Sequence, residues 1–545
     1  MVAVQPETSG GERRLRILFV FDRAGVVRQY ASAVAELLRR GHDVTLGLQT
    51  PGGDLPGAVS GPAGARVEHV PGRSASGGWP PVVWLVRALG DLARYSDPRY
   101  EHAPVLRRRM SQKVVGRLAR PGAGGPIGRR LALRVARRLA AGSDAALSAR
   151  VIGVVRRLEA AIPTSPQVDV YLESGRFDAV LVTSAVKLAS SQVEFLKSAR
   201  RLGIPAASCV ASWDNLTNKG LLKVVPERVI VWNDRQRDEA VELHGVPRER
   251  VVATGAQLFD AWFERLPSTP RERFVATIGL DPAEPYVLFV GSSPFVTNHS
   301  DDEVRFVVRW IEALRASDDD RLRRIGIAVR PHPVGKGWRD ADLSRFANVA
   351  VWPRHSERPI DPHDQADFFH SLAHSAAVVG INTTAMIEAA VVGKSVLTVL
   401  APEFAQESTL HFHHLLEENG GFLHVASSLA GHVGQLARVL DEGAADAERR
   451  RRFVASFVRP HGLERPATPI FADEVERLAT LPIADPVARA GVLLRAALRT
   501  EVALTSARLA LARKRRNAHA LRARAAGALR RRRVGRAQAS STGSR

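Results

Sequence analysis

Short apolar runs typical of buried parallel β-strands recur along this 545-residue chain and alternate with stretches of helical periodicity. A first series occupies residues 15–22, 42–48, 65–70, 177–184, 204–212, 228–233 and 250–255. A second series occupies residues 286–293, 325–330, 349–353, 376–382, 395–400 and 421–426. Strands that alternate with helices pair in parallel, so the sequence predicts an α/β protein with two consecutive Rossmann-like domains facing a cleft.

The spacing of these runs also predicts the domain boundaries. We expect a disordered N-terminus (1–14), an N-terminal domain (15–263) with a basic helical insertion (72–165), a linker (264–285), a C-terminal domain (286–480) and a basic helical or disordered tail (481–545). The final residues, 536–545, are polar and small and are expected to be disordered.

The net charge of +22 is concentrated in two segments. Residues 107–157 carry +13 and residues 489–545 carry +15, which leaves −6 for the rest of the chain. Such segments suit an anionic membrane surface or nucleic acid, although a solvated basic tail has the same composition. The single cysteine, Cys209, fits a reducing compartment, and no apolar stretch is long enough to span a membrane. A cytoplasmic location is therefore expected, with peripheral attachment to the inner face of the plasma membrane as an extension.

Residues that directly follow the strands are the candidates for ligand binding, because ligands of open α/β sheets collect at the carboxyl ends of the strands. Gly291, Ser292 and Ser293 follow the first strand of the second series and suit a phosphate oxygen, although a polar turn would look the same. Arg330 and His332 end a later strand between prolines, where a guanidinium and an imidazole can meet phosphate oxygens.

A third candidate is the sequence "NTTAMIEAAVVGKSV", in which Asn382, Thr383 and Thr384 open a helix. A polar residue that caps a helix leaves free N–H groups that attract an anion. Glu388 lies one turn after Thr384, on the same helix face, where its carboxylate can accept both hydroxyls of a ribose. A cap explains the polar triplet but does not explain a glutamate inside an otherwise apolar helix.

The stretch "SWDNLTNKG" after residue 211 is unusual for a loop, because it sets Trp213 beside Asp214 and Asn215 and ends on Lys219 and a glycine. It leaves the carboxyl end of a predicted strand and should face the cleft. The alternative is an Asx-turn with a buried Trp213.

Other sequence patterns argue against several classes of protein and site. The chain has no P-loop and no Gly-x-Gly-x-x-Gly after its first strand, which argues against a P-loop kinase or a dinucleotide oxidoreductase. The spacing of His411, His413 and His414 matches no metal site, and a histidine near a nucleotide base is the better use for one of them. The acidic runs at 300–303 and 318–320 suit solvated loops, so no metal is expected.

The layout over residues 15–480 resembles the GT-B glycosyltransferases. "NTTAMIEAAVVGKSV" resembles the nucleotide-sugar-binding helix that this superfamily shares with the non-hydrolysing nucleotide-sugar 2-epimerases, except that Ser395 stands in place of a proline. "RPHP" (330–333) resembles a motif of the CDP-glycerol glycerophosphotransferases, whose Trp-His-Gly element corresponds here to Trp213-Asp214-Asn215 and therefore lacks the histidine. The whole chain also resembles a group of uncharacterised actinobacterial GT-B-like proteins.

The resemblance implies transfer of a sugar or sugar-like group from a nucleotide-activated donor to an envelope glycan or lipid-linked acceptor, without a cofactor. Asp214 would take the acceptor proton, Trp213 would stack on a sugar, and Asn215 and Lys219 would bind acceptor or phosphate. Arg330, His332 and the helix that starts after Thr383 would stabilise the leaving diphosphate. The alternatives are a nucleotide-sugar 2-epimerase and a GT-B module that binds glycan or membrane without catalysis. No nucleic-acid partner is expected, because the basic segments lack interleaved aromatic residues.

Overall fold

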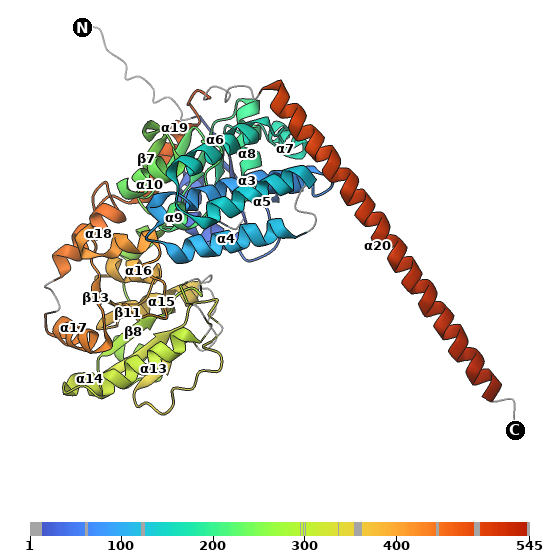
Figure 1. Cartoon of the computed structure of the whole chain (residues 1–545). Helices are drawn as coiled ribbons and strands as arrows, with labels where there is room; N and C mark the ends of the chain where they lie inside the picture. Colours follow the sequence, from blue (N-terminus) through green and yellow to red (C-terminus); the bar gives the residue numbers. More distant parts are fainter. Residues whose placement is uncertain are drawn as a thin grey trace, which may run out of the picture.

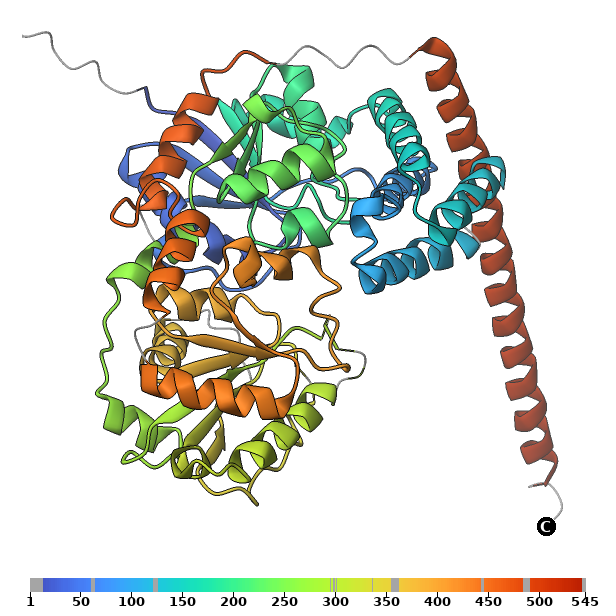
Figure 2. The same ribbon diagram turned by 60° about the vertical axis from the view of Figure 1, so that its left-hand side comes forward.

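The computed structural model describes residues 13–59, 64–120, 126–294, 296–297, 299, 301–335, 337–353, 362–442, 446–483 and 491–541. Two domains lie one above the other, with a bundle of helices beside the N-terminal domain and a long C-terminal helix (Figures 1 and 2). The predicted disorder of residues 1–14 falls almost wholly outside the described residues.

Seven parallel strands form the N-terminal sheet, in the order β3-β2-β1-β4-β5-β6-β7. The strands are β1 (Arg16–Phe21), β2 (Asp43–Leu48), β3 (Arg66–His69), β4 (Ala179–Val182), β5 (Ala206–Cys209), β6 (Arg228–Val231) and β7 (Val251–Ala253). Its connecting helices and turns are α1 (Ala24–Val27), η1 (Arg28–Tyr30), α2 (Ala31–Arg39), η2 (Gly57–Val59), α7 (Pro166–Gly175), α8 (Val193–Leu202), α9 (Asn215–Asn218), α10 (Asp234–His244), η4 (Arg248–Arg250), η5 (Gln257–Phe259) and α11 (Asp260–Glu264).

Six parallel strands form the C-terminal sheet, in the order β10-β9-β8-β11-β12-β13. The strands are β8 (Tyr286–Val290), β9 (Gly326–Arg330), β10 (Val349–Val351), β11 (Ala377–Gly380), β12 (Val396–Val399) and β13 (His424–Ala426). The helices and turns of this domain are α12 (Arg271–Thr277), α13 (Asp302–Arg315), α14 (Asp320–Arg324), α15 (Pro362–Ala373), α16 (Ala385–Val391), η6 (Leu410–Leu415), η7 (Glu417–Asn419), α17 (Leu429–Glu442) and α18 (Ala447–Phe457).

Every strand segment expected from the sequence contains one of these strands, so the predicted α/β fold with two parallel sheets is confirmed. The reason is visible in β1 and β8, in which every residue except Arg16 is buried. A parallel strand covered by helices on both sides needs a continuous apolar run, and that pattern is easy to read in a sequence.

Helix α19 (Ala467–Leu478) belongs to the C-terminal end of the two-domain body but packs on the N-terminal sheet. Its Phe471, Ala472, Val475 and Leu478 join the apolar core formed by β1 and α2. The His42 ring lies 2.9 Å from a Glu476 oxygen in the same interface. Helix α19, which lies at the end of the predicted C-terminal domain (286–480), therefore ties the two domains together.

Four helices form a bundle beside the N-terminal sheet, which we call the helical module: α3 (Trp79–Tyr95), α4 (Pro104–Ala119), α5 (Pro126–Ala141) and α6 (Ala145–Ala161). They lie within the predicted insertion, and the turn η3 (Pro98–Tyr100) joins α3 to α4. Their apolar faces pack on one another, as an amphipathic bundle requires.

The long helix α20 (Val492–Ser541) is held to this module by its first turns. Leu494, Leu498 and Val502 pack against valines of α3 and α6, while the remainder projects past the module (Figure 2). The helix runs to Ser541, so residues 536–541 are helical rather than disordered, and 542–545 lie outside the described residues.

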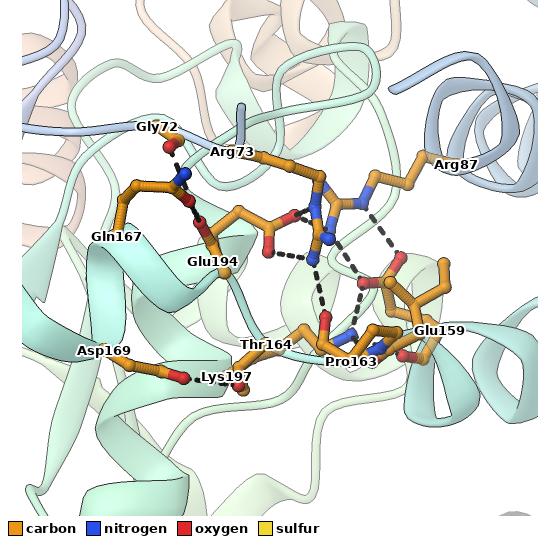
Figure 3. Close-up of polar contacts among 12 residues, drawn as sticks. Gly72, Arg73, Arg87, Glu159, Pro163, Thr164, Gln167, Asp169, Glu194 and Lys197 are labelled. Atoms are coloured by element: carbon orange, nitrogen blue, oxygen red, sulfur yellow. Dashed lines mark hydrogen bonds and ion pairs between the residues drawn. The ribbon is translucent and has the colours of Figure 1, made fainter. Parts of the chain in front are cut away.

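A buried network of charged side chains locks the helical module to α8 (Figure 3). The Arg87 guanidinium of α3 lies 2.7 Å from both a Glu159 oxygen of α6 and a Glu194 oxygen of α8. Arg73 and Lys197 complete the network at 2.6 Å from Glu194 and 3.1 Å from Glu159. Removing one member would leave a buried charge without its partner, at a cost of about 3 to 5 kcal/mol.

Candidate functional site

A cavity of about 320 Å³ lies between the two domains, where loops from the carboxyl ends of both sheets meet. The N-terminal domain contributes Ser212, Trp213, Asp214, Asn218 and Lys219, and the C-terminal domain contributes Ser293, Val296, His332, Asn382, Thr383, Thr384 and His411. Loops predicted independently from the two halves of the sequence therefore line one space. A second hollow of about 280 Å³ lies beyond Thr217, but none of the predicted site residues line it.

Trp213 joins the two domains. It is only 3% exposed and belongs to the apolar core of the C-terminal domain. Its indole Nε1–H donates to the Thr384 hydroxyl at 3.2 Å, and its ring meets the His411 ring edge-on with centroids 4.5 Å apart. These contacts leave little ring surface for the predicted stacking on a sugar, and they give Trp213 a part in holding the cleft together.

Asp214 points into the cavity rather than into a local turn. It precedes α9, but its side chain caps none of the helix N–H groups, so of the predicted alternative the structure contains the buried Trp213 and not the Asx-turn. Its Oδ2 lies 3.3 Å from Lys219 Nζ, and its Oδ1 accepts from the Asn215 amide at 3.1 Å. Burial acts to raise the pKa of Asp214, but Lys219, His411 and Ser212 outweigh it and lower the pKa to about 2.

The loop that carries Asp214 and Lys219 is fixed by the last turns of α3. The buried Arg94 guanidinium donates to four carbonyl oxygens, those of Leu216 at 2.5 Å, Thr217 at 2.8 Å, Lys219 at 2.9 Å and Gly220 at 2.8 Å. These oxygens lie at the C-terminal end of α9, which a cation stabilises. The Tyr95 hydroxyl adds a further bond, to the Lys219 carbonyl at 2.8 Å.

A buried ion pair continues this support on the far side of the loop. The Asp91 carboxylate of α3 accepts from the backbone of Ala189 and Leu221 at 2.9 and 2.6 Å. Lys223 Nζ, fully buried, lies 2.5 Å from the same carboxylate. A side chain at Gly220 would place its Cβ 2.3 Å from Asp91, which explains the glycine that ends the motif. The sequence reasoning missed Asp91, Arg94, Tyr95 and Lys223, although charged residues inside the apolar pattern of 79–95 were the available signal.

On the opposite wall, Gly291 and Ser292 have structural tasks. A Cβ at Gly291 would lie 2.5 Å from the backbone nitrogen of His332, so only glycine lets the loops after β8 and β9 approach so closely. The Ser292 hydroxyl accepts from the Asn382 N–H at 3.1 Å, and the Ser292 N–H donates to Glu303 at 2.6 Å. Of the predicted "GSS" residues, Ser293 is the one that lines the cavity.

Arg330 and His332 point to different places, although the sequence predicted a joint role. His332 lines the cavity. Arg330 Nη1 donates instead to Asp367 at 2.6 Å and to Ser371 at 2.9 Å, and its guanidinium lies over the Phe368 ring. A phosphate contact by Arg330 would therefore have to use its other guanidinium nitrogens.

The polar triplet before α16 faces the cavity, but it does not cap the helix through a side chain. Asn382 is nearly buried, with its amide nitrogen 2.9 Å from the Thr409 hydroxyl and its oxygen 3.1 Å from His411 Nε2. Thr384 occupies the position before the helix, and its hydroxyl receives the Trp213 bond instead of capping. Because α16 has only seven residues, hydroxyls rather than a long helix dipole are its main contribution to the cavity.

Glu388 lies one turn into α16, outside the residues that line the cavity, and is partly buried. Burial raises its pKa to about 7, although Arg28 of the N-terminal domain and Arg330 act to lower it. Glu388 is therefore costly to ionise and lies near a cation of the opposite domain. A carboxyl group in this position is a candidate for binding the hydrogen-bond donors of a ligand.

His411 lies between the domains as a neutral imidazole. Burial lowers its pKa to about 3, although Asp214 acts to raise it. Its Nε2 faces the Asn382 oxygen and its Nδ1 lies 3.4 Å from the Thr217 hydroxyl. His414 pairs with Glu239 across the same interface at 2.6 Å. Among the described residues, no group of three His, Cys, Asp or Glu side chains is placed to hold a metal ion.

Two parallel Rossmann-like sheets whose carboxyl ends face a shared cleft, with a final helix returning to the first domain, form the GT-B arrangement. The chain therefore has the GT-B fold that the resemblance implied.

No family model matches the sequence, and no curated protein matches it. Among solved structures, the chain is similar to the UDP-GlcNAc 2-epimerase from Neisseria meningitidis bound to UDP-GlcNAc, at 13% identity and a TM-score of 0.45, over 85% of this chain and 100% of that one. It is also similar to WaaG, a glycosyltransferase involved in lipopolysaccharide biosynthesis, at 14% identity and a TM-score of 0.43, over 85% of this chain and 99% of that one. A putative UDP-N-acetylglucosamine 2-epimerase from Listeria monocytogenes gives 10% identity and a TM-score of 0.48, over 86% and 98%.

Proposed function

We propose that the protein is a glycosyltransferase that moves a sugar or sugar-like group from a nucleotide-activated donor to an acceptor hydroxyl. The observation that carries the proposal is the interdomain cavity, in which the ion pair of Asp214 and Lys219 on one wall faces His332, Thr383 and Thr384 on the other. Its two walls belong to different domains, which suits a reaction between two substrates.

Each wall has groups suited to one substrate. Thr383 and Thr384 offer hydroxyls, and His332 offers an imidazole, to the diphosphate of a donor held by the C-terminal domain. Glu388, one turn further along α16, has the carboxyl group that the ribose of the same donor would contact. Lys219, 42% exposed, can reach either a phosphate or an acceptor.

In the reaction, the acceptor hydroxyl oxygen bonds to the sugar's anomeric carbon while the bond from that carbon to the diphosphate oxygen breaks. The nucleoside diphosphate leaves with the electron pair, and Lys219 and His332 offset its developing charge. The proton of the acceptor passes to Asp214. A carboxylate with a pKa near 2 accepts it only once the new bond has made the acceptor oxygen strongly acidic.

A nucleotide-sugar 2-epimerase is the competing enzyme. That chemistry requires several acidic and basic groups around one sugar, whereas among the described cavity-lining residues Asp214 is the one carboxylate. The acceptor is proposed to be an envelope glycan or a lipid-linked molecule, because the N-terminal domain also carries the basic helical module.

The test begins with a thermal-shift panel of UDP-, GDP-, CDP- and dTDP-sugars, in which the true donor raises the unfolding temperature by mass action. Asp214→Asn should then bind the stabilising donor normally and lose transfer to an acceptor. Conversion of the donor sugar in the absence of any acceptor would identify an epimerase. Stabilisation by a donor that is never turned over with any acceptor tested would identify a binding module.

A further inference from the structure

Helix α5 of the helical module exposes an apolar and basic face. Ile127 and Leu131, one turn apart, are 69% and 60% exposed, which is unusual for large aliphatic side chains. Arg130, Arg134 and Arg138 are spaced at i+3, i+7 and i+11 from Ile127, so they lie along the same stripe of the helix. The opposite side of α5 is buried through Ala132, Ala136 and Leu139, which fixes the direction that this face points.

Helix α20 extends the charge of this face. It crosses α5 where a side chain at Gly128 would meet Glu501, the one acidic residue of α20. The exposed residues Arg513, Lys514, Arg515 and Arg516 follow the docked turns. Residues 513–545 contain twelve arginines and lysines and no acid. The turn that follows the docked part of α20, residues 513–516, is therefore both exposed and entirely basic.

We propose that the exposed face of α5, together with the outer part of α20, is a docking surface for an anionic lipid bilayer. A bilayer surface has a layer of headgroup phosphates above a layer of acyl chains. The guanidinium groups of α5 would contact the phosphates, while Ile127 and Leu131 would insert at the boundary of the acyl chains. Nucleic acid fits less well, because α4, α5 and α20 contain no Phe, Tyr or Trp to stack on bases. Attachment would be peripheral, since within the described ranges no helix is long and apolar enough to cross a membrane.

The experiment is co-sedimentation of the full chain with vesicles of phosphatidylcholine alone or of equal parts phosphatidylcholine and phosphatidylglycerol. Binding is expected to the anionic vesicles only and to fall as salt rises. Arg134→Gln/Arg138→Gln should weaken it by roughly tenfold, and Ile127→Ser/Leu131→Ser by a similar factor. The control for the arginine variant is Arg451→Gln/Arg452→Gln, which changes two exposed arginines of α18. The control for the aliphatic variant is Val170→Ser, which changes an exposed valine of α7. Both controls should bind like the wild type.

The tail is tested by a truncation that keeps the docked turns of α20. Removal of 513–545 leaves Leu494, Leu498 and Val502 in place and should weaken binding further, whereas removal from residue 486 would also strip the cover from α3 and α6. Equal binding to neutral and anionic vesicles would overturn the proposal. The proposal would also be overturned if the α5 variants bound vesicles as well as their controls do. The same holds if duplex RNA abolished vesicle binding while Ile127→Ser/Leu131→Ser left it unchanged. The assay needs no nucleotide, so its result is separate from the proposed transferase activity.

Discussion

Glu388→Gln is expected to stabilise the protein at about pH 8 and, at the same time, to weaken its binding of a nucleotide sugar. Burial raises the pKa of Glu388 from 4.5 to about 7 in the folded protein. Between these two pH values the folded protein binds more protons than the unfolded chain, so its stability falls as the pH rises through the window. Glutamine fills the same space without ionising and therefore avoids that loss.

The size of the effect follows from the two pKa values. A carboxyl group with a pKa of about 7 when folded and 4.5 when unfolded destabilises the fold by about 3 kcal/mol once it is ionised. Because Glu388 is partly exposed, we expect about 2 to 3 kcal/mol. That corresponds to a rise in the unfolding temperature of about 2 to 6 °C, the smaller value applying if the whole chain unfolds as one unit.

The assay is thermal unfolding of the wild type and of Glu388→Gln at about pH 8 and at about pH 4.5, with isothermal titration of the donor found by the nucleotide panel. The gain should be present at the higher pH and absent at the lower one. Glu312→Gln, on the exposed side of α13, is the control and should show no such difference. A gain of the same size at both pH values would refute the electrostatic reasoning, and unchanged donor affinity would remove Glu388 from the ribose site.

Three further predictions concern the site loop, the contact between the two domains and the docking of α20. Arg94→Met should cost about 3 to 5 kcal/mol in thermal unfolding, because it removes the cation from four carbonyl oxygens of the site loop; Arg94→Lys should lose less, and an unchanged midpoint in both would contradict the assigned role. Trp213→Phe and Thr384→Val should each cost about 1 kcal/mol, and a double-mutant cycle should give a coupling of similar size, whereas strictly additive effects would mean that the bond across the domains contributes nothing. Leu498→Ala should expose α20 to limited proteolysis, while Leu504→Ala, at a more exposed position, should not; equal cleavage of both would mean that Leu498 does not hold the helix.

The fold was predictable because each buried strand requires a continuous apolar run, and β1 or β8 can be recognised without knowing their neighbours. The cleft was predictable for a related reason. Asp214, His332 and Thr384 all follow strand ends, and parallel strands bring those ends to the same edge of each sheet, where the cleft lies. Their side-chain directions were not predictable. Whether Arg330 meets a phosphate or Asp367 depends on α15, a helix 32 residues further along the chain, and no local pattern carries that information.

The helical module is the clearest case of what the sequence concealed. Its many arginines predicted a charged surface. They gave no sign that Asp91 and Arg94, in the same stretch of sequence, are buried and bind the site loop. One helix, α3, thus has three contacts in order along its length. Its first turns hold α20, Arg87 in its middle is locked to α8, and its last turns fix the loop of Asp214 and Lys219. The helices proposed to meet the bilayer and the loop proposed to bind the acceptor are therefore connected through one continuous helix. A bilayer bound to α5 and α20 would therefore hold the cleft at a set distance and angle from the lipid surface, as an enzyme acting on a lipid-linked acceptor requires.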